Sequence, residues 1–150
     1  MHPCDYFNEE ISLNDVEQKI VDDFHKLYFK KLEQRSGLQL SWLGHLTGKL
    51  PSDLWRYQEI IFEYKPDLII ECGTHWGGSA LYLANMMDLI GHGQVLSIDL
   101  YPKSPLPIHS RICYLQGNST DPNIVSKVFN IASNHERIIV LLDSDHHADH

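Results

Sequence analysis

The residues most suited to binding or catalysis lie between an apolar run and a predicted helix that begins with small residues. The run at 67–71 ends in Glu71, and the chain then reads Cys-Gly-Thr-His-Trp-Gly-Gly-Ser up to Ser79. Gly73 can turn the backbone tightly and lie close to a ligand, because no Cβ is in the way. An acid followed by a glycine turn and a helix is typical of a nucleotide-type cofactor site, although a plain strand–turn–helix joint reads the same way.

Two further polar groups follow the next apolar runs. Asp99 ends the run at 95–99, where an acid can accept hydrogen bonds from two ribose hydroxyls or simply be solvated. Gly117, Asn118 and Ser119 follow the run at 112–116, where they read as an ordinary turn or as the edge of a base-binding site. Because parallel strands end at the same edge of a sheet, these groups are expected to face the glycine turn.

The last set of polar residues follows the apolar run at 138–142. Asp143 could hold Mg²⁺ or another hard divalent cation, which would bind and polarise a substrate hydroxyl. His146 stands three residues later and could take the hydroxyl proton. His147 and His150 are better explained as solvated residues. Upstream, Lys49 could line the same site or could be a solvated loop residue.

Hydrophobic periodicity predicts the elements that position these groups. We expect helices at 14–34 and from near 52 to 65, with an irregular loop at 38–50 between them. From residue 67 the chain alternates strands at 68–72, 95–99, 112–116 and 138–142 with helices at 79–90 and 122–133. This alternation predicts an α/β fold with a parallel sheet. The expected division is a helical segment at 1–65 and a cofactor-binding domain at 66–150.

Composition restricts the classes of function. The chain has 150 residues and a formal net charge of −8, which argues against electrostatic binding to nucleic acid or anionic membranes. Three separated cysteines and no recognisable signal peptide favour a cytoplasmic protein with reduced thiols. No apolar run is long enough to span a membrane.

The spacing Glu-x-Gly-Thr-x-x-Gly-Gly-Ser resembles the first motif of S-adenosylmethionine (SAM) dependent methyltransferases. In such a site Ser79 and its helix would meet the carboxylate of SAM, and Glu71 its ammonium. Five motifs in order are similar to the cephalosporin hydroxylase/rhamnosyl O-methyltransferase family. They are Trp42-Leu43-Gly44, the segment 49–61, the segment 65–79, Gly117–Asp121 and Leu142–His146.

This resemblance implies a Rossmann-like class I methyltransferase fold, with strand order 3-2-1-4 in the present chain, preceded by two helices. It implies a metal-assisted O-methyltransferase that acts on a hydroxyl of a sugar or other secondary metabolite. The implied cofactors are SAM and Mg²⁺. The implied roles place Gly73, His75, Gly77 and Ser79 around the methionine end, Asp99 at the ribose and Ser119 at the adenine. Asp143 would bind metal, and His146 would be the base.

Alternatives remain open at this point. A non-haem iron hydroxylase could draw its ligands from the terminal histidines and aspartates. The family pattern also continues through further strands and a second acidic metal pair, whereas this sequence stops at His150. The chain could therefore be a fragment, could be completed by another chain, or could be a non-catalytic SAM-binding protein. We expect self-association through the unpaired edge of the strand at 138–142.

Overall fold

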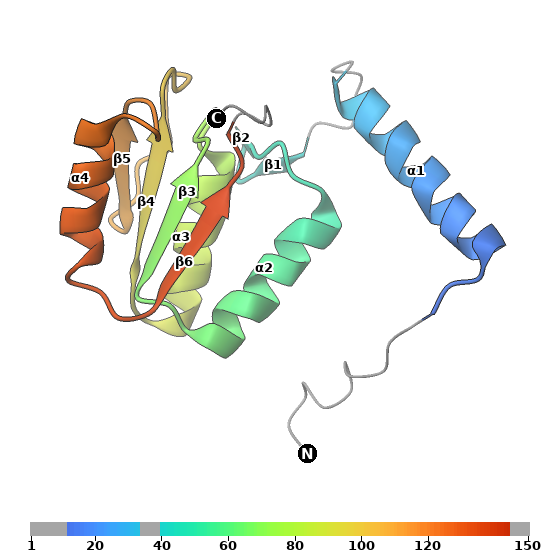
Figure 1. Cartoon of the computed structure of the whole chain (residues 1–150), viewed down its shortest axis with the longest axis horizontal. Helices are drawn as coiled ribbons and strands as arrows, with labels where there is room; N and C mark the ends of the chain where they lie inside the picture. The colour runs from blue at the N-terminus through green and yellow to red at the C-terminus, as the bar shows by residue number, and fades with distance from the viewer. Residues whose placement is uncertain (1–11, 34–39, 145–150) are drawn as a thin grey trace. The chain divides into compact units, whose positions relative to one another are not determined.

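The computed structural model describes residues 12–33 and 40–144. Its contacts divide the chain into two units, 1–39 and 40–150 (Figure 1). The predicted boundary at residue 65 stays a prediction, but the second helix lies in the same unit as the sheet. Within the described ranges, no helix is long and apolar enough to cross a membrane.

The first unit contains one described helix, α1 (Asp15–Glu33). Asn14 caps it, because its side-chain oxygen accepts hydrogen bonds from the backbone N–H groups of Val16 and Glu17. The carboxylate of Glu17 accepts from the Asn14 N–H in return, at 2.9 Å, which completes a reciprocal cap. The helix predicted at 14–34 is thus present within one residue at each end.

The second unit is built on a four-stranded parallel sheet. Its strands are β3 (Leu68–Cys72), β4 (Gln94–Asp99), β5 (Ile112–Gln116) and β6 (Ile138–Leu142). Their spatial order is β5-β4-β3-β6, which confirms the predicted order 3-2-1-4. All five residues of β3 are buried, because a strand lies on each side of it and helices cover both faces.

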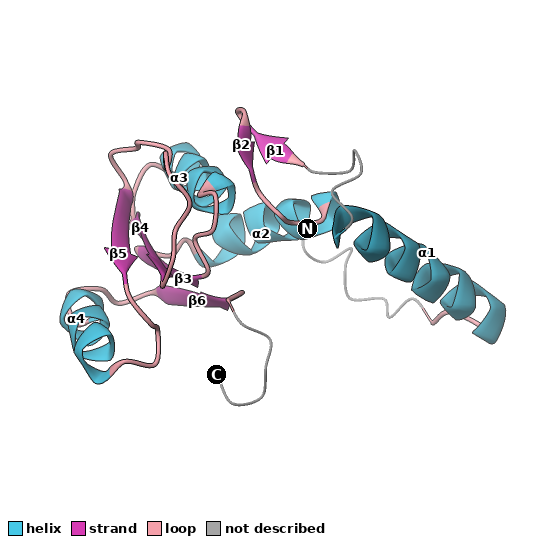
Figure 2. Ribbon diagram, turned by 90° about the horizontal axis from the view of Figure 1, so that it is seen from above, coloured by secondary structure: helices cyan, strands magenta, loops and turns pink. Residues whose placement is uncertain are grey.

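Helices cover the two faces of the sheet unequally. Helices α2 (Pro51–Tyr64) and α3 (Gly78–Ile90) pack on one face, and α4 (Pro122–Ala132) packs on the other (Figure 2). Strand alternation sends Ile69 to the α2/α3 side and Ile70 to the α4 side, so the two cores meet only through the sheet. Burial of these two apolar clusters is the main force that holds the unit together.

One small element was not predicted. A two-stranded hairpin, β1 (Ser41–Trp42) and β2 (His45–Leu46), occupies part of the expected loop at 38–50. Trp42 anchors it to α3, since the indole Nε1 donates to Asn85 at 2.8 Å and the ring meets Tyr82 edge-on. The hairpin also lies against Gly78, where a Cβ would overlap the Leu46 carbonyl. Glycine at this position lets the hairpin reach the first turn of α3.

Candidate functional site

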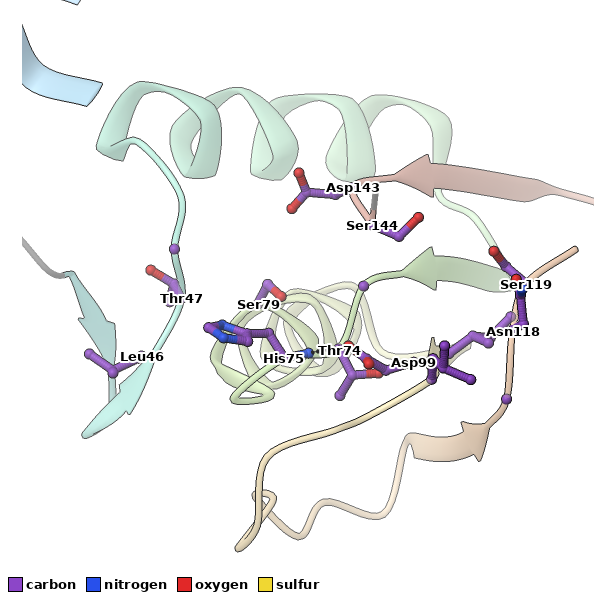
Figure 3. Close-up of a pocket in the computed structure, with 15 residues that line it drawn as sticks. Leu46, Thr47, Thr74, His75, Ser79, Asp99, Asn118, Ser119, Asp143 and Ser144 are labelled. Carbon is purple, nitrogen blue, oxygen red and sulfur yellow. Dashed lines mark hydrogen bonds between the residues drawn. The ribbon is translucent and has the colours of Figure 1, made fainter. Parts of the chain in front are cut away.

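A pocket of about 780 Å³ opens at the carboxyl end of the sheet. This is the edge at which parallel α/β sheets bind ligands, and the volume is within the usual range for small-molecule sites. Figure 3 shows the segment after β2 at one end of the pocket and the turn after β5 at the other. Six of the predicted site residues line it: Gly73, His75, Ser79, Asp99, Ser119 and Asp143.

The floor of the pocket depends on close contact between two strand ends. Gly73 has φ +108, and a Cβ on it would overlap the backbone carbonyl of Asp143. Two hydrogen bonds hold the same junction: the Gly73 N–H donates to Ile98 at 2.8 Å, and the Asp143 N–H donates to Cys72 at 3.0 Å. The glycine turn predicted from the sequence therefore brings the ends of β3, β4 and β6 together.

Asp99 presents an ordered carboxylate to the pocket. Its Oδ2 accepts the backbone N–H of His75 at 2.7 Å, and its Oδ1 accepts that of Tyr101 at 2.8 Å. His75 reaches this position with a left-handed backbone, at φ 48. A carboxylate has about four lone-pair sites, so both oxygens can still accept a ligand hydroxyl. The arrangement suits a vicinal diol such as that of ribose.

Glu71 lies beneath the pocket and is fully buried. Its Oε2 accepts from Ser97 Oγ at 2.7 Å, and the Ser97 hydroxyl also meets that of Thr74 at 2.7 Å. Its Oε1 has no hydrogen-bond partner among the described residues. Burial raises the pKa of Glu71, while the hydroxyls of Ser79 and Ser97 and the charge of Lys49 lower it. Glu71 does not itself line the pocket, so it would act on a cationic ligand group through its charge, from behind the lining residues Thr74 and Ser79.

Gly77 does not line the pocket. It is the N-cap residue immediately before α3, with φ 74, and a Cβ on it would come within 2.6 Å of Pro107. Gly77 therefore allows the proline-rich segment after β4 to lie against the start of α3. Gly77 thus has a packing role in the fold, and its assignment to the methionine end of SAM stays a prediction.

Asp143 forms an ion pair with Lys49. From the sequence, Lys49 could be either a site residue or a solvated loop residue. The Lys49 side chain is only 5% exposed, and its ammonium also lies 5.9 Å from the centre of the Tyr57 ring. The Asp143 side chain is 39% exposed and reaches the pocket. No sequence signal identifies this pair, because its members stand 94 positions apart.

Asp143 fits the chemistry of a divalent-cation ligand, but the described residues contain no group of three or more His, Cys, Asp or Glu side chains placed to hold a metal. His146, predicted to be the base, lies outside the described residues, as do Asp145 and Asp149. The described part thus contributes one carboxylate at the predicted position of the metal.

Comparisons with known proteins agree with this architecture. The family described as Rhamnosyl O-methyltransferase/CmcI matches residues 34–150. A rhamnosyl O-methyltransferase of Mycobacterium tuberculosis (strain H37Rv) is 35% identical over 136 residues, which cover 87% of this chain and 54% of that protein. One from Mycobacterium leprae (strain TN) is 36% identical over 131 residues, covering 85% of this chain and 56% of that protein. The chain spans about half the length of these relatives.

Solved structures show the same fold. An apo structure of CmcI superposes with a TM-score of 0.62 at 24% identity, covering 76% of this chain and 49% of that one. A CmcI structure with Mg and SAM gives a TM-score of 0.60 at the same identity and coverage. This likeness confirms the predicted Rossmann-like methyltransferase fold.

Proposed function

Because the chain belongs to the Rhamnosyl O-methyltransferase/CmcI family, we propose that it binds SAM and forms the cofactor-binding part of a metal-assisted O-methyltransferase. The observation that carries this proposal is the ordered carboxylate of Asp99, which faces the same pocket as the glycine turn and Ser79. An acid with two pre-ordered oxygens is suited to a ribose, and a helix start is suited to the carboxylate of an amino acid.

Each predicted cofactor-binding residue has a distinct role in this proposal. Asp99 accepts the ribose hydroxyls, Ser79 and the first turn of α3 meet the carboxylate of SAM, and Ser119 lies at the adenine end. Glu71 supplies negative charge to the ammonium, directly or through water, and its buried position behind the lining residue Ser79 supports that part. Gly73 and His75 shape the wall near the methionine moiety, and Gly77 supports it from outside the pocket.

SAM would supply an electrophilic methyl group, and a divalent cation would lower the pKa of the acceptor hydroxyl. The residues of the chain would hold the two reactants in line, so that the new oxygen–carbon bond forms as the carbon–sulfur bond breaks. Asp143 would hold the cation and His146 would remove the hydroxyl proton. The acceptor would be a small hydroxylated molecule such as a sugar or another secondary metabolite. A cytoplasmic location stays a prediction.

Isothermal titration with S-adenosylhomocysteine (SAH) and, separately, with NAD tests the cofactor assignment. We expect SAH to bind with one-to-one stoichiometry and NAD to give no saturable signal. Tight NAD binding without SAH binding would overturn the proposal. The iron-hydroxylase alternative requires ligands at 145–150, and nothing in the described residues favours it.

A further inference from the structure

The ion pair between Lys49 and Asp143 points to a function for Lys49 that the family resemblance does not assign. Lys49 stands in the segment between β2 and α2, and Asp143 follows β6. Burying an ammonium is costly unless a negative charge compensates it, so a lysine that is 5% exposed depends on its partner. Asp143 Oδ2 accepts directly from Lys49 Nζ.

The neighbours of Lys49 hold the ammonium where it is. The face of the Tyr57 ring on α2 lies 5.9 Å away, which suits a cation. The negative charge of Glu71, buried beneath the pocket, also interacts with Lys49. Lys49 is therefore a buried residue held against Asp143, which lines the pocket, rather than a solvated loop residue.

The same carboxylate is the proposed metal ligand, so two cations compete for it. We propose that Lys49 is a positioning residue whose ammonium supplies the counter-charge of Asp143 and competes with a divalent cation for its carboxylate. This inference rests on the proposed metal site at Asp143. A divalent cation that approaches Asp143 is repelled by the Lys49 ammonium or must displace it. The ammonium therefore lowers the affinity of this site for the cation.

The test is binding of Mn²⁺ alone, measured by electron paramagnetic resonance of the free ion, in the 150-residue chain. Lys49→Met keeps most of the side-chain stem and removes the charge. We expect it to bind Mn²⁺ at least about tenfold more tightly than the wild type, and we expect Asp143→Asn to abolish that gain. Lys49→Arg should behave like the wild type. Lys127→Met removes an equal charge from an exposed position on α4 and should change nothing.

Equal or weaker Mn²⁺ binding by Lys49→Met, including no binding by either protein, would overturn the inference. SAH titration of the same samples separates the two proposals, because SAH binding without this Mn²⁺ effect leaves the cofactor assignment standing.

A second measurement on the wild type does not depend on how the variant folds. Lys49 should react faster with acetic anhydride when Mn²⁺ is present, while Lys127 serves as the internal control. Unchanged or reduced labelling of Lys49 would also overturn the inference.

Discussion

Gly73 lies so close to the Asp143 backbone carbonyl that a Cβ at position 73 would overlap it. The absence of a side chain thus lets the end of β3, which carries the glycine turn, touch the end of β6, which carries the proposed metal ligand. This contact, together with the hydrogen bond from the Asp143 N–H to Cys72, holds two sides of the pocket together.

Gly73→Ala should therefore lower the free energy of unfolding and weaken SAH binding. We expect a loss of about 2–4 kcal/mol from left-handed backbone strain and steric overlap together. Urea denaturation followed by circular dichroism measures it. Gly44→Ala is the matched control, because Gly44 has φ +87 but nothing within 4 Å of its added Cβ. An equal loss in both variants would show that backbone strain alone, and not the contact with Asp143, is responsible.

Glu71 should make stability depend on pH in a defined direction. Burial raises its pKa above the ordinary value of 4.5, so the folded chain holds this proton more tightly than the unfolded chain. Ionisation therefore costs stability: the cost is absent well below that ordinary value, grows as pH rises, and is complete above the raised pKa. Glu71→Gln removes the cost.

The stability of Glu71→Gln relative to the wild type should thus increase with pH through this window and then stay constant. Urea denaturation over a pH series measures the difference, and Glu136→Gln is the control at an exposed carboxylate. A difference that shrinks as pH rises would contradict the direction of the shift.

The described residues leave the outer edge of β6 without a paired strand, and Val140 and Leu142 are 53% and 79% exposed. An apolar unpaired edge favours pairing with another chain. We expect the 150-residue chain to self-associate as its concentration rises, and Val140→Lys to reduce this association in light scattering. Leu89→Lys, at an even more exposed apolar position on α3, should not. A monodisperse wild-type monomer in which the β6 amides resist hydrogen exchange would contradict the prediction.

His146 should affect turnover but not cofactor binding. In a form of the protein that transfers methyl groups, His146→Ala should lower kcat by about 10²–10⁴, the usual contribution of a positioned base, and leave SAH affinity nearly unchanged. Asp143→Ala should abolish both activity and its dependence on Mg²⁺. Full turnover in His146→Ala would mean that another group takes the proton.

The sheet could be predicted because its strands are short runs that are mostly apolar, even though β3 contains Glu71 and β4 contains Ser97. The bounds of β3, β5 and β6 agree with the prediction, and β4 begins one residue earlier, at Gln94. The hairpin at 41–46 was missed, since two-residue strands leave no periodic pattern. Its turn uses Leu43 at φ 49, a residue that does not normally signal a left-handed turn.

The pocket was predictable in outline for a related reason. Gly73, Asp99 and Asp143 each follow an apolar run directly, so the topology alone brings them to one edge. The burial of Lys49 and the contact between Ser97 and Glu71 involve residues that are far apart in the sequence and meet only after folding. Local sequence patterns therefore could not predict either contact. The ligand roles of all these residues stay predictions.

The central claim is that Asp99 holds the ribose of a SAM-type cofactor, and titration of SAH into Asp99→Ala tests it most directly. Two hydrogen bonds to a charged group would be lost, so affinity should fall at least about 30-fold, or about 2 kcal/mol. Asp22→Ala, on α1 in the other unit, should bind SAH like the wild type. Unchanged SAH affinity in a folded Asp99→Ala protein would contradict the account.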